Sequence, residues 1–219
     1  MNAQKVRISS HCIRQFARIG VVFLVMTLAA LPLRATTVIA PAFNQLVGQA
    51  DYIVHAVVKS VASEIRGSGV HRHIITKVEL DVREVISGSP PEPLILQMVG
   101  GKVGSEEMVV DGAPKFKVGD EDILFVHGNG RQINPLVALM HGRYPVKHDT
   151  HTGREYVSRS NGEPLLSEQQ VSRTMAAESV KGETAPTVTT AVSSALSPAE
   201  FTNRIKMAIK QNSGSKIEN

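Results

Sequence analysis

Cysteine is nearly absent from this 219-residue sequence. Its one cysteine, Cys12, lies among the basic residues at the start of the chain. Without the first 35 residues, the chain can form no disulfide, no thiolate metal site and no cysteine nucleophile. Many small exported domains depend on disulfides because their cores are small. We therefore expect packing and hydrogen bonds alone to hold this domain together.

Recognisable catalytic motifs are also missing. There is no Gly-x-Ser-x-Gly elbow, no Ser-x-x-Lys pair and no His-Glu-x-x-His helix. The Gly100–Gly104 run has no following helix and no Lys-Ser/Thr ending, so we interpret it as a strand-connecting loop with positive-φ glycines rather than a phosphate loop. The acidic run Asp120–Asp122 lacks the spaced oxygen ligands of a calcium loop, and we interpret it as an exposed turn before a strand.

The first 35 residues have the three-part pattern of a secretory signal peptide. Positions 1–18 contain four basic residues and no acidic one, an apolar run covers 19–31, and Ala35 is a small residue at a possible cut. The apolar run is shorter than the roughly 18 residues that a spanning helix needs. We predict cleavage after Ala35, with Ala30 as the alternative, export to the periplasm or beyond, and no membrane span in the mature chain.

Removing this segment changes the net charge. Five of the 24 basic residues and none of the 20 acidic ones lie in the first 35, so 19 basic and 20 acidic residues remain and the net charge falls from +4 to −1. The basic balance of the whole chain therefore belongs to the targeting segment. The composition gives no support for a nucleic-acid partner.

The next 130 residues read as a chain of short strands. A short helix is expected at 41–49, followed by strands at 52–58, 74–86, 94–99, 107–110, 123–126, 136–146 (bent at Gly142) and 155–158. No long amphipathic helix separates these strands, so the crossover helices of a parallel sheet are missing. We predict a mostly β domain over 36–165, a small, antiparallel and strongly curved barrel with one short N-terminal helix.

The composition changes after this domain. Residues 166–197 are predicted to be a flexible linker, 198–211 an amphipathic helix and 212–219 a disordered tail. Ser197, Pro198 and Glu200 form a helix start with a serine cap and a glutamate placed to cap back. Phe201, Ile205 and Ile209 share one apolar stripe. Either this helix docks on its own barrel, or these three residues bind a partner from a flexible tether.

Several segments together resemble a group of uncharacterised exported bacterial domains. They are Ala50–Val54 continuing through Ser60–Val61, Ile75–Val82, Gly100–Gly104, and Gly112–Asp120 leading to Phe125–Val126. Such domains are similar to the OB/netrin-like barrel of tissue metalloproteinase inhibitors and accompany secreted, matrixin-like zinc proteases. The resemblance implies a protease-associated binding role. Those inhibitors chelate zinc through an N-terminal cysteine that this mature chain lacks, so no functional residue is transferred.

Seven histidines follow the predicted signal peptide. His71 and His73 are two residues apart, so on a strand both rings would project from one face and could hold zinc or copper. A third ligand would have to come from His148, His151 or Glu64. The alternative is an exposed strand end. His55 and His127 lie within apolar strands, which favours hydrogen-bonded, half-buried side chains.

We therefore expect an exported, non-enzymatic protein-binding module without a cofactor, a regulator or companion of an exported zinc metalloprotease. One alternative is a metal-dependent hydrolase with a histidine-centred site, and another is a structural envelope protein. Three or more converging His, Asp or Glu side chains would favour the hydrolase. An open sheet edge or an exposed apolar patch would favour the binding module.

Overall fold

The structure, a computed structural model, describes residues 39–173, 175 and 188–215. The predicted signal peptide at 1–35 lies outside the described residues. So do 176–187 of the predicted linker and 216–219 of the predicted tail. Among the residues that are described, no helix combines the length and apolar character needed to cross a membrane.

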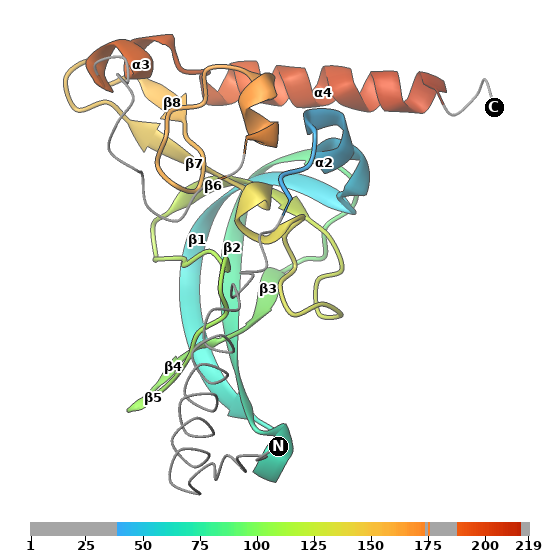
Figure 1. The fold of residues 1–219 in the computed structure, drawn as a ribbon, viewed down its shortest axis with the longest axis vertical. Helices are drawn as coiled ribbons and strands as arrows, with labels where there is room; N and C mark the ends of the chain where they lie inside the picture. Colours follow the sequence, from blue (N-terminus) through green and yellow to red (C-terminus); the bar gives the residue numbers. More distant parts are fainter. Residues whose placement is uncertain (1–38, 174, 176–187, 216–219) are drawn as a thin grey trace, which may run out of the picture. The chain divides into compact units, whose positions relative to one another are not determined.

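The described chain is mostly β, with antiparallel sheets, as the sequence predicts. The larger sheet has the order β3-β2-β1-β6-β7-β8, and β4 pairs with β5 in a smaller one (Figure 1). The strands are β1 (Tyr52–Arg66), β2 (His73–Ser87), β3 (Leu94–Val99), β4 (Gly101–Val103), β5 (Glu106–Met108), β6 (Glu121–Val126), β7 (Arg143–His148) and β8 (Glu155–Val157).

Helices are few and short, apart from the last. They are α2 (Phe43–Gln49), α3 (Val188–Ser194) and α4 (Pro198–Ser215), with 3-10 turns η1 (Gly69–His71), η2 (Leu139–Gly142) and η3 (Glu168–Ser172). α2 confirms the predicted N-terminal helix. Figure 1 shows α2 and α4 at one end of the large sheet and the β4–β5 hairpin at the other.

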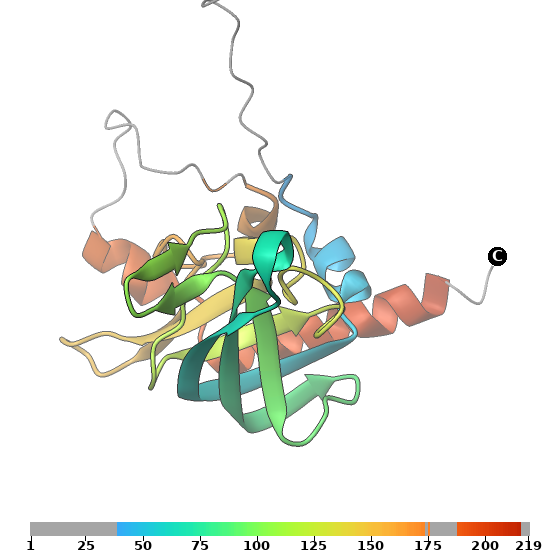
Figure 2. The ribbon, with the colours of Figure 1, turned by 90° about the horizontal axis from the view of Figure 1, so that it is seen from below.

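β1 and β2 form a long hairpin. β2 has the predicted alternation, with Val78 and Leu80 buried and Asp81 exposed. β1 extends to Arg66, well beyond the predicted end at 58, and pairs with β2 from Ile53↔Ser87 to Arg66↔His73. Its distal half, Lys59–Arg66, has only Val61 and Ile65 as large apolar residues, so the usual apolar signal of a strand is weak there. Figure 2 looks at this hairpin from its tip, where η1 connects the two strands.

Each face of the sheet has its own core. On one face, α2, α4 and η3 cover Ile53, Phe125 and Tyr144. On the other, β1, β2, β3 and β6 contribute to a second cluster that includes Val54, Leu96 and Leu124, with Phe116 and Leu136 added from loops. Central strands with both faces buried explain why β1 and β6 read as continuous apolar runs at 52–58 and 123–126.

The sheet does not close into a barrel within the described residues, where β3 and β8 are its edge strands. The segment between β6 and β7 nevertheless spans the gap to β3. Val99 N donates to Ile133 O at 2.8 Å, while Leu136 forms a bridge with Val126 of β6. The amide of Asn129 also contacts the β3 backbone, at Gln97 N (3.1 Å) and Ile95 O (2.8 Å). Single hydrogen bonds therefore replace a strand ladder there.

The predicted strand at 136–146 is wrong in its first half. Ala138 and Leu139 adopt positive φ (50° and 58°), η2 follows, and the strand begins only at Arg143. Gly142 has no room for a side chain, because a Cβ there would lie 2.7 Å from the Val137 carbonyl oxygen. The chain therefore turns tightly before β7, where the sequence pattern indicated a continuous strand with one bend.

The predicted linker and tail are shorter than expected. Val171 is buried near one end of 166–197 and Leu196 at the other, and α3 lies within that range. The last helix continues to Ser215 rather than 211. Its predicted cap is confirmed, since Glu200 accepts hydrogen bonds from the Ser197 backbone N (2.7 Å) and hydroxyl (2.8 Å).

Candidate partner-binding site

A largely apolar pocket lies between the distal half of the β1–β2 hairpin and the β4–β5 hairpin. We call it the hairpin pocket. Its volume is about 240 Å³, and its apolar walls include Val61, Val78, Met98, Met108 and Phe116. An apolar pocket with a few placed polar groups is the usual form of a ligand site. The hairpin pocket is therefore a candidate binding site.

The floor of the pocket contains two hydroxyl groups. The Thr76 hydroxyl donates to Gly100 O at 2.6 Å, and the Ser63 and Thr76 hydroxyl oxygens are 2.9 Å apart. Ser63 is on β1 and Thr76 on β2, and the two face each other across the ladder. Cross-strand hydroxyl pairs of this kind stabilise a sheet locally. Here they also place polar atoms inside an apolar wall.

Two glycines let the β4–β5 hairpin approach the sheet closely. Gly100 and Gly101 have φ values of 108° and 130°, which confirms positive-φ glycines, although Gly101–Val103 form β4 rather than part of a loop. A Cβ on Gly101 would lie 2.2 Å from Thr76 Oγ1 and 2.6 Å from Ser63 Oγ. The shape of the pocket floor therefore depends on glycine at this position.

Replacing Gly101 with alanine is expected to destabilise the domain by roughly 1–3 kcal/mol, because the backbone is strained and the hydroxyl pair must separate. Gly104→Ala is the matched control, since Gly104 also has positive φ (60°) but no atom within 4 Å of its Cβ position. Urea unfolding of both variants measures the difference. Equal losses would mean that the close approach at Gly101 has no energetic consequence.

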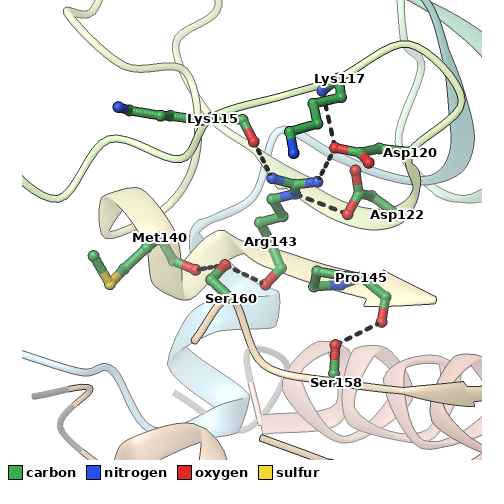
Figure 3. A network of polar contacts seen from close by, with 9 residues as sticks. All are labelled: Lys115, Lys117, Asp120, Asp122, Met140, Arg143, Pro145, Ser158 and Ser160. Atoms are coloured by element: carbon green, nitrogen blue, oxygen red, sulfur yellow. Dashed lines mark hydrogen bonds and ion pairs between the residues drawn. The ribbon is translucent and has the colours of Figure 1, made fainter. Parts of the chain in front are cut away.

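Arg143 holds the loop that bounds the pocket on one side (Figure 3). Its guanidinium donates to Lys115 O at 2.6 Å, to Asp120 Oδ2 at 2.7 Å and to Asp122 Oδ1 at 2.8 Å. It also lies over the Phe116 ring, 4.3 Å from the centroid. Lys115 and Phe116 line the pocket, so this buried cation fixes part of its wall.

The acidic partners of Arg143 differ from the sequence interpretation. Asp122 is completely buried, and Asp120 is only 24% exposed, so the predicted exposed turn is wrong for both. Burial raises the pKa of Asp122, although the charge of Arg143 opposes this rise. Burial alone would lower the pKa of Arg143, but the charge of Asp122 and the hydrogen bonds that Arg143 donates to both carboxylates raise it. The arrangement is an ion-pair network rather than a cation site.

One edge of β1 is open beside the pocket. β6 pairs only with Tyr52–Val57, and the bonds between Val58 and residues 119 and 120 end that contact. In the described part of the chain, only β2 is hydrogen-bonded to the backbone of Lys59–Arg66. An unpaired strand edge is a template for another extended chain.

Val61 and Ser63 present their backbone groups to the open edge. Val58, whose side chain is on the pocket face, directs its N–H and C=O toward the β6 side. A register shift between Val58 and Ser60 brings Val61 to the same face as Val58, since their partners on β2, Leu80 and Val78, are two residues apart. Pairs two residues apart along an antiparallel ladder direct their N–H and C=O groups to the same side. Val61 and Ser63 line the pocket, so their free N–H and C=O groups point to the open edge. The edge and the pocket thus share residues.

The predicted metal ligands are not brought together. His71 lies in η1 at the exposed hairpin tip, and its carbonyl oxygen is 2.8 Å from His73 Nδ1. Glu64 forms ion pairs with Arg66 and Lys77. Hydrogen bonds from these two residues, the larger effect coming from Lys77, lower the pKa of Glu64. His148 lies 3.7 Å from Glu155, and His151 donates its backbone N–H to Asp149. Among the described residues, no three His, Cys, Asp or Glu side chains form a metal-binding group.

The two strand histidines have carboxylate partners. His55 is 16% exposed, with Nε2 2.7 Å from Glu121 Oε1, which confirms a hydrogen-bonded, half-buried side chain. His127 is 44% exposed and lies 3.1 Å from Asp51. The carboxylate of Asp51 also accepts a hydrogen bond from Gly128 N, and this backbone bond is the main cause of its lowered pKa. These pairs connect strand ends rather than forming a reaction centre.

The predicted partner-binding stripe of the last helix is turned inward. Phe201 and Ile205 are fully buried in the core that covers the sheet, and Ile209 packs against the same core. In this structure the stripe therefore docks on the chain's own sheet, one of the two alternatives that the sequence leaves open. The exposed face of α4 instead carries residues such as Met207, which is 61% exposed.

Sequence reasoning missed Ser63, Thr76 and Arg143 as site residues. The signal for Gly101 was present, because two adjacent glycines between strands indicate a close backbone approach. The pairing of Ser63 with Thr76 depends on the register of a hairpin whose first strand was predicted to end before Ser63. No family of known proteins matches the chain, and a search of curated proteins finds no similar sequence. The resemblance to netrin-like domains therefore rests on the quoted segments alone.

Proposed function

We propose that this chain is an exported, non-enzymatic protein-binding module that binds an extended segment of a partner along the open edge of β1. The observation that supports this function is the open edge at Lys59–Arg66, next to a preformed apolar pocket lined by the same strand. In strand addition, main-chain hydrogen bonds provide affinity and side-chain pockets provide specificity. Both elements are available here at Val61 and Ser63.

The proposed partner is an exported zinc metalloprotease, which this module accompanies or regulates. That choice comes from the resemblance to netrin-like and inhibitor barrels. The second core among β1, β2, β3 and β6, and the hydrogen bond from Val99 N of β3 to Ile133 O after β6, support this choice. Export follows from the proposed signal peptide. Binding in this proposal needs neither a bound metal nor a cofactor.

Val61→Pro is expected to weaken partner capture by about tenfold or more. Proline removes the N–H that faces the open edge, leaves the ladder with β2 intact, and is tolerated on edge strands. One lost hydrogen bond and the bulk of the ring correspond to about 1.4 kcal/mol. The measurement is a pull-down from the exported fraction of the source cells with the processed chain as bait, followed by titration with the purified partner.

The matched control is Val61→Ala, which keeps the N–H and trims the pocket wall. Strand addition predicts strong capture by the wild-type chain and Val61→Ala and weak capture by Val61→Pro. Equal capture by all three chains would rule out binding along this edge. The open edge could instead bind a second copy of this chain, and light scattering on the wild-type chain tests this alternative. A dimer that Val61→Pro abolishes would assign the edge to a second copy and overturn the proposal.

A further inference from the structure

The hydroxyl pair in the hairpin pocket has a defined proton direction. Gly100 O can only accept, so the single proton of the Thr76 hydroxyl is used in the 2.6 Å bond to it. The 2.9 Å contact between Ser63 and Thr76 then requires the Ser63 hydroxyl to be the donor. Ser63 Oγ keeps its lone pairs and has no proton left to give. The described residues provide no further partner for this oxygen.

The Ser63 hydroxyl oxygen is therefore an available hydrogen-bond acceptor beside the apolar walls of the pocket. A complementary group has an apolar body and a single O–H or N–H donor at its end. Phe116, Met98 and Met108 suit a flat ring, because methionine sulfur and aromatic rings both pack favourably against aromatic groups. Hydroxyl side chains as short as serine would not fill a cavity of about 240 Å³. A phenol combines the ring and the donor.

We propose that the hairpin pocket binds a tyrosyl side chain of the partner segment, with its hydroxyl donating to Ser63 Oγ. This inference rests on the proposed function, because a strand added beside β1 would lie about 4.8 Å from it. Every second side chain of such a strand is on the same face as Val61 and Ser63. The occupant is a protein side chain for this reason, and a free phenolic molecule is an outcome that the test separates.

The test uses p-cresol, the side-chain analogue of tyrosine, and toluene, the analogue of phenylalanine. The wild-type processed chain, with ¹³C-labelled methionine methyls, is titrated with each. We expect shifts at Met98 and Met108, no shift at the exposed Met207, and about tenfold tighter binding of p-cresol. In Ser63→Ala the two compounds should bind equally. Ser63→Thr, which keeps the acceptor, should retain the preference.

Equal binding of both compounds to the wild-type chain would overturn the donor preference, and no shift at Met98 or Met108 would overturn the site. An extended peptide with a central tyrosine is then compared with its phenylalanine version. Binding of p-cresol without preference for the tyrosine peptide would assign the pocket to a free phenolic ligand and overturn the tyrosyl proposal. If p-cresol does not bind, but Val61→Pro still weakens partner capture, only the tyrosyl inference is overturned. If p-cresol binds, but Val61→Pro captures the partner as well as the wild-type chain does, the proposed function is overturned.

Discussion

Replacing Phe201 with alanine is expected to destabilise the domain by about 3–5 kcal/mol, the range for a large aromatic removed from a core. Phe201 is fully buried and contacts three other rings, with centroid distances of 5.9 Å to Phe43, 6.3 Å to Phe125 and 4.9 Å to Tyr144. These rings belong to α2, β6 and β7. One side chain of α4 therefore joins the helix to three separate parts of the chain.

The measurement is urea unfolding followed by far- and near-ultraviolet circular dichroism. Met207→Ala is the control on the same helix, because Met207 is exposed and its replacement should change the free energy of unfolding little. A loss for Phe201→Ala no larger than that of the control would show that α4 is not docked in solution. That result would restore the alternative in which this helix binds a partner from a tether.

The sequence predicts features that depend on residues close together in the chain, and it does not predict features that depend on residues far apart. The α4 cap depends on Ser197 and Glu200, three residues apart, and was predicted correctly. The alternation of β2 is equally local. The end of β1 is different, because residues 59–66 are held as a strand by pairing with β2 rather than by their own propensity. Local pattern alone placed the boundary too early.

The same reasoning explains the outcome for the site residues. The spacing of His71 and His73 suits two metal ligands, but a metal site needs a third side chain from elsewhere in the chain. In the folded structure Glu64, His148 and His151 contact other partners instead. Ser63 and Thr76 meet only through the hairpin register. The apolar stripe of α4 was recognised from its period, yet a stripe that packs on its own core and one that binds a partner have the same sequence pattern.

Arg143 is the residue whose removal should have the other large effect. Arg143→Met is expected to cost about 3–5 kcal/mol, because it leaves the buried carboxylate of Asp122 without its compensating charge. Asp122 Oδ2 has no hydrogen-bond partner among the described residues, so the bond from Arg143 Nε to Oδ1 is the main contact of that carboxylate. Urea unfolding measures the loss, and Arg66→Met, which removes an exposed ion pair, is the control.

A second variant separates the charge effect from lost packing over Phe116. In Arg143→Met/Asp122→Val, neither buried charge remains, and replacing a buried ion pair by apolar residues is often neutral or stabilising. The double variant should therefore recover most of the stability lost in Arg143→Met. If it is as unstable as the single variant, the contribution of Arg143 comes from its stacking on Phe116 and its bond to Lys115 O. Because those contacts form the pocket wall, p-cresol binding would then fall in both variants, whereas a purely electrostatic role predicts recovery of binding together with stability.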